Sequence, residues 1–259
     1  MRMMKKVLGT VTVLALSVSL LAGCGSTAAS PVSSAASTAA ESTTSSVVSE
    51  TTSAAADENE AAAAQLLNDL TGSYQELWPV ILADEYKQTW LDDCTALVGE
   101  ENAEAAFEKL SSMVTGDVYG EDAVEAYANG GGAYFCGFTN SLATLTFDGE
   151  TSTISGTDKD GNVLFSHTYH YIGMEPVHGL YEFESDDADS GEFTYFFLAP
   201  DISAETYHIE FRYGSDAEAL SQYDAGEYAY WVASGISTDC DQTMIDNCIE
   251  LFCTENLAG

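Results

Sequence analysis

The sequence predicts an α+β fold, mainly β with helices: an antiparallel β-barrel or strongly curled sheet, preceded by N-terminal helices and closed by a C-terminal helix. Three observations predict it. The hydrophobic period changes to two residues after Gly130. Short runs rich in Tyr, Phe, Thr and Val then alternate with turn residues, among them Asp148-Gly149 and Asp160-Gly161, which are typical of hairpins. Near the C-terminus the helical period returns.

The first 23 residues have the pattern of a secretory signal peptide. Three basic residues precede an apolar run, and residues 21–24 read Leu-Ala-Gly-Cys. This tetrapeptide resembles the bacterial lipobox, in which the Cys thiol receives a diacylglycerol. We therefore expect residues 1–23 to be removed and Cys24 to become the lipid-carrying first residue. The lipid would anchor the chain in the outer face of the cytoplasmic membrane.

Residues 24–56 are expected to form the lipidated Cys and a flexible tether. From Gly25 to about Ala56 the chain is almost entirely Ser, Thr, Ala and Val with a few Glu, and it has no aromatic residue. Such a composition buries too little apolar surface to order itself. The barrel domain is therefore expected over residues 57–259, which is enough chain for one domain with a sizeable core.

The charge of the chain is strongly negative, at −35. Removal of residues 1–23 would take three of the seven basic residues and none of the 42 acidic ones, leaving −38. Such a surface repels phosphate backbones, which excludes nucleic acid as a partner. It attracts cations, but the charge alone favours the simpler interpretation that it keeps the domain soluble.

Three helices are expected before the barrel. The first spans residues 57–70 and begins with acidic residues, which favour the positive end of a helix. The second spans residues 74–90, with an interruption or kink at Pro79, and the third spans residues 101–113. Their apolar stripes are interpreted as faces that pack into a core.

Seven consecutive strands with short turns are expected after Gly130, a pattern typical of an up-and-down barrel. They are predicted at residues 133–138, 142–147, 151–155, 162–171, 177–184, 192–199 and 205–213. A last helix over residues 239–254 has one apolar side that would pack on the barrel.

Five cysteines follow Cys24, an odd number, so at least one is unpaired or pairs between chains. Most of the five are interpreted as small apolar core residues. They are Cys94, Cys136, Cys240, Cys248 and Cys253.

The strand predicted at residues 205–213 carries the candidate metal ligands. Because side chains alternate along a strand, His208 and Glu210 point to the same face. Imidazole and carboxylate together are transition-metal ligands, and Asp201 in the preceding turn is the nearest candidate for a third. The alternative is that this polar face is simply solvated.

The other three histidines are weaker candidates. His167 and His170 have opposite parity on their strand, so they do not share a face unless a bulge intervenes. His167 is expected to pack among aromatic residues with a hydrogen bond. His178 lies at the start of a strand, where its direction is not determined by the pattern.

Several segments together resemble the ZinT/YodA domain: residues 70–79, the strand series after Gly130, residues 195–200 and residues 207–216. The resemblance covers most of residues 66–235. That family has a lipocalin-like barrel and recruits zinc outside the cytoplasm, and it also occurs as the C-terminal part of some zinc-binding lipoproteins.

The resemblance also implies a ligand set. Residues 206–216 resemble the family segment that holds a His-x-His pair six and four residues before a Gly. Counting back from Gly214 gives His208 and Glu210, and the family's other His falls at Asp201. One His of three is kept and carboxylates take the other two positions, which implies a weaker zinc site, a site for a harder cation, or a barrel that has changed its ligand.

Three functions follow as hypotheses. The leading one is a non-enzymatic lipoprotein that binds a divalent metal ion, with zinc as the candidate, and passes it to a metal-uptake transporter. The second is a lipocalin-like module for a small organic ligand with a degenerate metal site, suggested by the aromatic strands. The third is a hydrolase, which ranks last because the sequence has neither G-x-S-x-G nor H-E-x-x-H.

Overall fold

The computed structural model describes residues 47–199 and 208–258, and for residues 47–57 the backbone alone. The chain divides into two units at residue 58, and the second unit, residues 59–259, holds the barrel. The predicted signal peptide, Cys24 and Asp201 lie outside the described residues. In the part that the structure describes, no helix is both long enough and apolar enough to cross a membrane.

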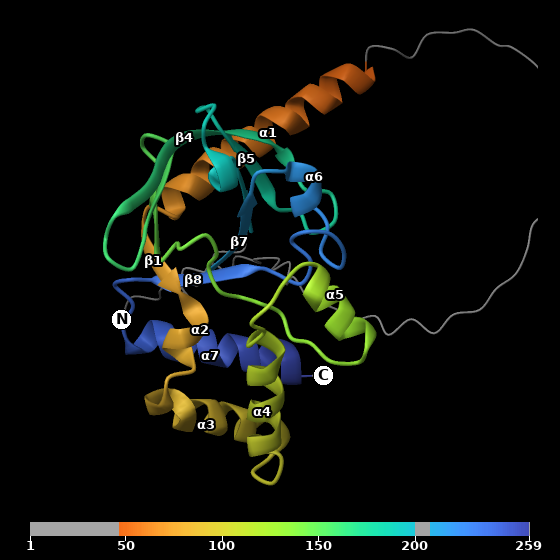
Figure 1. The fold of residues 1–259 in the computed structure, drawn as a ribbon, viewed down its shortest axis with the longest axis vertical. Helices are drawn as coiled ribbons and strands as arrows, with labels where there is room; N and C mark the ends of the chain where they lie inside the picture. Colours follow the sequence, from red (N-terminus) through yellow and green to blue (C-terminus); the bar gives the residue numbers. More distant parts are fainter. Residues whose placement is uncertain (1–46, 200–207, 259) are drawn as a thin grey trace, which may run out of the picture. The chain divides into compact units, whose positions relative to one another are not determined.

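A closed antiparallel barrel of eight strands forms the centre of residues 59–259, and each strand pairs with its neighbours in the sequence (Figure 1). The strands are β1 (Gly72–Glu76), β2 (Thr144–Asp148), β3 (Thr153–Thr157), β4 (Val163–Met174), β5 (Tyr181–Ser185), β6 (Tyr195–Leu198), β7 (His208–Gly214) and β8 (Ala233–Ser237). The barrel closes where β1 meets β8, with Tyr74 opposite Ser237 and Glu76 opposite Gly235. The predicted barrel is confirmed, and six of its seven predicted strands correspond to β2–β7.

The prediction was wrong about where the barrel begins. Residues 133–138 form no strand, because Phe135 makes only isolated bridges, one to Thr115 and one to Trp231. The first strand is β1, which lies where the second helix was predicted. Pro79 explains why a new helix begins directly after β1. It lies in the first turn of that helix, where its missing N–H is not needed.

The stretch predicted as one helix over residues 74–90 is therefore divided. After β1 it forms α2 (Leu77–Ile81) and the short helix η1 (Asp84–Tyr86), and α3 (Lys87–Val98) then extends beyond the predicted end. The other predicted helices are confirmed as α1 (Val47–Asp69), α4 (Ala103–Val114) and α7 (Gln242–Leu257). Helix α1 begins ten residues before its predicted start, so residues 47–56 of the expected tether are helical. The sequence analysis missed β8, α5 (Glu121–Ala128), η2 (Gly191–Phe193) and α6 (Ala217–Leu220).

Aromatic side chains fill the barrel. Phe147, Phe183, Phe196, Phe211 and Tyr213 are each at most 1% exposed and belong to one apolar cluster. The Phe196 ring lies 5.4 Å from Tyr213 and 6.3 Å from Phe211, centroid to centroid. The interior is thus a packed core, which does not favour the hypothesis of an organic ligand inside the barrel.

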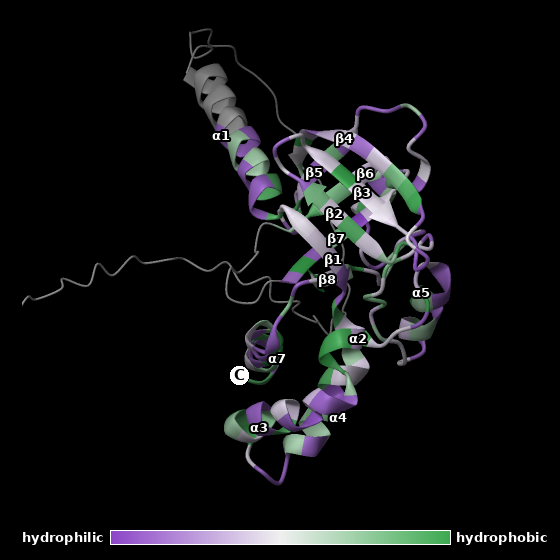
Figure 2. Cartoon of the chain, turned by 90° about the vertical axis from the view of Figure 1, so that its left-hand side faces the viewer, coloured by the Kyte–Doolittle hydropathy of each residue, from purple (hydrophilic) through white to green (hydrophobic). Residues whose placement is uncertain are grey.

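A second apolar cluster joins the helices outside the barrel. Helices α2, α3, α4 and α7 pack together on one side of the barrel (Figures 1 and 2). Trp90 of α3 and Ile249 of α7 are fully buried in this cluster, which also includes Ile236 of β8. Helix α7 was expected to pack on the barrel itself, whereas it packs chiefly against α3 and α2.

Arg212 is the one basic residue buried among the described residues, at 0% exposure. Its guanidinium donates hydrogen bonds to the carbonyls of Leu220, Gln222 and Tyr228 and lies 4.2 Å over the ring of Tyr223. Burial lowers the pKa of Arg212. Arg212 belongs to the polar face of β7. The alternative that this face is simply solvated is therefore wrong for this residue.

Acidic residues face one another across α3 and α7. Burial, followed by the charges of Glu250, Asp246 and Asp92, raises the pKa of Asp93. A carboxyl whose pKa is raised by folding destabilises the folded state above that pKa, and the penalty disappears below the unfolded value.

We expect Asp93→Asn to raise Tm at pH 7 by about 1–3 °C. The gain should shrink on acidification and vanish below about pH 4, the ordinary range of an aspartate. Thermal unfolding monitored by circular dichroism at pH 3.5, 5 and 7 tests this. The exposed Asp84→Asn is the matched control, and an equal gain in both variants would show that net charge alone is responsible.

Candidate metal centre

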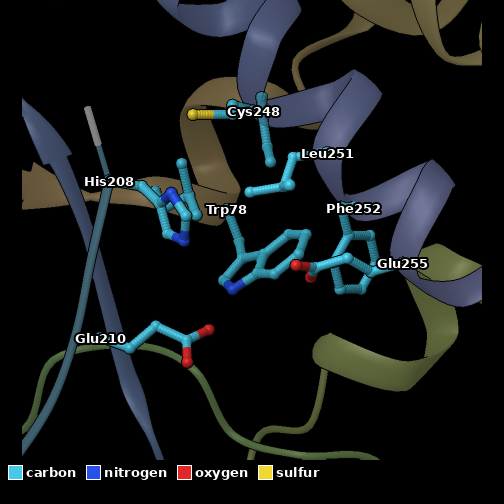
Figure 3. Close-up of a pocket in the computed structure, with 9 residues that line it drawn as sticks. Trp78, His208, Glu210, Cys248, Leu251, Phe252 and Glu255 are labelled. Atoms are coloured by element: carbon cyan, nitrogen blue, oxygen red, sulfur yellow. The ribbon is translucent and has the colours of Figure 1, made fainter. Parts of the chain in front are cut away.

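His208 and Glu210 lie on one face of β7, as predicted, while Ile209 and Phe211 between and after them point into the barrel core. Both line a small, partly open cavity of about 40 Å³ between β7, α2 and α7 (Figure 3). Its other lining residues are Leu77, Trp78, Ile81, Cys248, Leu251, Phe252 and Glu255. By this measure about 10–15 Å³ holds one water molecule, so the space accommodates an ion and a water ligand.

The C-terminal helix contributes two further donor side chains to this cavity. Cys248 and Glu255 are seven residues apart on α7, so they lie two turns apart on one side of the helix. The Glu255 carboxylate is directed over Trp78 toward the side where His208 and Glu210 lie (Figure 3). The sequence analysis missed Glu255, although its spacing from Cys248 placed it on the helix side that faces inward.

The donors differ in exposure and in protonation. His208 and Glu210 are half-buried, Glu255 lies at the exposed rim, and Cys248 is buried. Burial, followed by the charge of Cys240, raises the pKa of Cys248 to about 12. Cys248 is therefore a neutral thiol at pH 7 unless a metal ion binds and displaces its proton, so the imidazole and the two carboxylates are considered first as donors.

Trp78 forms the floor of the cavity and has an unsatisfied polar atom. Its ring nitrogen faces the side of His208 and Glu210 (Figure 3), is buried, and has no hydrogen-bond partner. The sulfur of Cys136 lies near it but is a weak acceptor without hydrogen-bond geometry. A buried N–H normally has a partner, so an acceptor bound beside the two β7 side chains would be favourable for this atom.

Trp78 also borders a second, more open cavity of about 340 Å³. This space lies beside Phe135 and Cys136, with Glu76 at its edge. The Glu76 carboxylate already accepts a hydrogen bond of 2.6 Å from the backbone N–H of Phe138. The indole ring thus separates a cavity with metal-type donors from a second one with a mostly apolar lining.

As placed, the donors are not gathered around a single point. Among the described His, Cys, Asp and Glu residues, no group of three or more could hold a metal ion. The structure brings His208 and Glu210 to the same cavity, whereas Asp201, the predicted third ligand, lies outside the described residues. Coordination therefore requires movement of the carboxylate side chains, which are unbranched and have several rotatable bonds.

The remaining histidines lie elsewhere. His167 is half-buried, hydrogen-bonded through Nδ1 to Asp187 at 2.7 Å and stacked near Phe165, which confirms the prediction of a packed, hydrogen-bonded ring. His170 is exposed, with Nδ1 2.8 Å from Asp186, which confirms the opposite parity. The ring of His178 lies 3.8 Å from that of Tyr223.

No family model and no characterised protein sequence matches the chain significantly. Among solved structures, the chain is similar to the Zn(II)-bound ZinT-like domain of Streptococcus pneumoniae AdcA, with 16% sequence identity and a TM-score of 0.45, covering 71% of this chain and 89% of that domain. It is also similar to the Zn(II)-bound AdcA of the same organism, with 16% identity and a TM-score of 0.43, covering 71% of this chain and 35% of that chain. The first of these structures carries the domain that the sequence resembles.

Proposed function

We propose that this chain is a non-enzymatic binding protein for a divalent transition-metal ion, with zinc as the first candidate. The observation that carries the proposal is the lining of one small cavity by an imidazole and two carboxylates, from His208, Glu210 and Glu255. These groups are the ordinary nitrogen and oxygen ligands of zinc and related ions. An acceptor bound to the metal, such as a water oxygen, would also serve the unsatisfied N–H of Trp78.

The donor set determines which ions compete. Two carboxylates and one imidazole form a harder site than three imidazoles, so the preference for zinc over manganese or magnesium is weaker. The charge of −35 raises the local concentration of every cation near the domain. We therefore expect the site to capture metal with modest selectivity.

Membrane anchoring completes the proposal. Lipidation of Cys24 after removal of residues 1–23 would hold the domain at the outer face of the cytoplasmic membrane, with residues 24–56 as the tether. From there the bound ion would pass to a metal-uptake transporter. Metabolic labelling with a fatty acid should mark the wild-type chain and leave Cys24→Ala unlabelled.

Calorimetric titration of the purified full chain with Zn²⁺ tests the metal site. Loss of an outer-shell partner alone weakens a metal site about 10–100-fold, so loss of two ligands in His208→Ala/Glu210→Ala should weaken binding by at least about 100-fold. Competition with Mn²⁺ and Mg²⁺ in the same experiment measures selectivity. Equal affinity of the double variant and the wild type would refute the proposed site.

A matched pair on one helix tests the role of Glu255. Glu255→Gln should weaken Zn²⁺ binding about tenfold, since it removes a charged ligand and keeps the size of the side chain. Glu250→Gln changes the same charge on an exposed part of α7 away from the cavity and should leave the affinity unchanged. Equal losses in both variants would assign the effect to net charge rather than to coordination.

A further inference from the structure

Two buried thiols meet where α3 packs on α7. The Sγ atoms of Cys94 and Cys253 are 3.9 Å apart, and both residues are 0% exposed. The two helices pack directly against each other (Figure 1). The sulfur atoms are therefore in van der Waals contact within the apolar cluster outside the barrel.

We propose that Cys94 and Cys253 are an oxidation site and form a disulfide bond when the chain folds outside the cytoplasm. The location is the one proposed above, while the chemistry is independent of the metal site. The oxidant is a disulfide, either a small molecule such as oxidised glutathione or a protein thiol oxidoreductase. Each cysteine gives up its thiol proton, the S–S bond between them forms, and the oxidant's S–S bond is reduced to two thiols.

Folding order decides when this reaction takes place. Disulfide exchange requires the attacking sulfur to contact a sulfur of the oxidant. In the folded chain both sulfur atoms are inaccessible to an oxidant. The bond must therefore form before α7 is fully packed, and packing then protects it from reduction.

The bond would also act on the proposed metal site. Helix α7 carries Cys248 and Glu255, which line the cavity of β7. A covalent link from Cys253 to α3 restrains the part of α7 between these two residues. The rival pairing would join Cys248 to Cys240, which lies near enough to influence the pKa of the Cys248 thiol.

Refolding followed by peptide mapping tests the proposal. The reduced, denatured full chain is refolded with oxidised and reduced glutathione, its free thiols are alkylated, and it is cleaved after Glu without reduction. Cleavage places Cys94 in residues 86–100 and Cys253 in residues 251–255, apart from the other cysteines. The expected product is these two peptides joined. Alkylation of both Cys94 and Cys253, or the joining of either to another cysteine, would overturn the proposal.

A thermal measurement tests the effect on stability. The oxidised chain should unfold about 5–15 °C higher than the same chain in reductant, because the bond closes a long loop. Cys94→Ala and Cys253→Ala should each lose this sensitivity to reductant, whereas Cys136→Ala, also a buried thiol, should keep it. The same reductant effect in all three variants would also overturn the proposal. Zinc affinity is measured separately in the oxidised and in the reduced chain. A failure of the proposed metal site is thereby distinguished from a failure of the disulfide proposal.

Discussion

Replacement of Arg212 by methionine is expected to lower the free energy of unfolding by about 3–5 kcal/mol. The guanidinium is the hydrogen-bond donor for three backbone carbonyls, those of Leu220, Gln222 and Tyr228. Methionine fills a similar volume but donates nothing, so buried acceptors lose their partners, each at a cost of about 1–3 kcal/mol. Urea unfolding followed by tryptophan fluorescence measures the change.

The control for Arg212 separates hydrogen bonding from charge. Lys159→Met removes one positive charge from an exposed turn and should change stability by no more than about 0.5 kcal/mol. If Arg212→Met were as stable as Lys159→Met, the segment from Leu220 to Tyr228 would not depend on the guanidinium. We also expect Arg212→Lys to be destabilising, since an ammonium cannot reach three carbonyls in the planar arrangement of a guanidinium.

Phe196→Ala is the second change with a large expected effect, a loss of about 3–5 kcal/mol. The ring is 0% exposed at the centre of the barrel, between Phe165, Tyr169, Phe211 and Tyr213. The loss has two parts, the transfer of the missing ring atoms and the cavity that the stiff barrel cannot close. Chemical unfolding measures this loss of stability, provided that the variant and the wild type have the same m-value.

A control and a ligand test accompany this variant. Ile172→Ala, on a side chain of β4 that is 40% exposed, should cost less than about 1 kcal/mol. The cavity left in Phe196→Ala has aromatic walls, so it should stay dry and bind benzene, which would raise Tm of the variant and not of the wild type. A stabilising effect of benzene on the wild type would instead show that the native barrel has space for an apolar ligand.

The sequence predicted the features that depend on local geometry. Alternation along a strand is imposed by the pleat, so the shared face of His208 and Glu210 followed from their spacing alone. The missed features depend on contacts between distant segments. The spacing of Glu255 from Cys248 gives the side of α7 on which it lies, but what that side faces depends on the packing of α7 against α2 and α3.

The same reasoning explains the two strands that were missed. Strand β8 reads Ala-Ser-Gly-Ile-Ser, which has little of the β-branched and aromatic content that usually marks a strand. Strand β1 is equally short and runs directly into α2. Each becomes a strand because the other lies opposite it, as Tyr74 does with Ser237. Residues 133–138, by contrast, have a strand-like composition but only isolated partners.

The pairing of β1 with β8 sets the timing of folding. These strands lie near opposite ends of the domain, so the barrel stays open until almost the whole chain has been synthesised. Until then, β1 and the last completed strand both present unpaired edges that can recruit other chains. Pairing between such distant segments is slow because of the entropy of loop closure. Loss of residues 233–259 should therefore produce a chain that aggregates. A holdase chaperone should be needed most just before β8 is synthesised and pairs with β1.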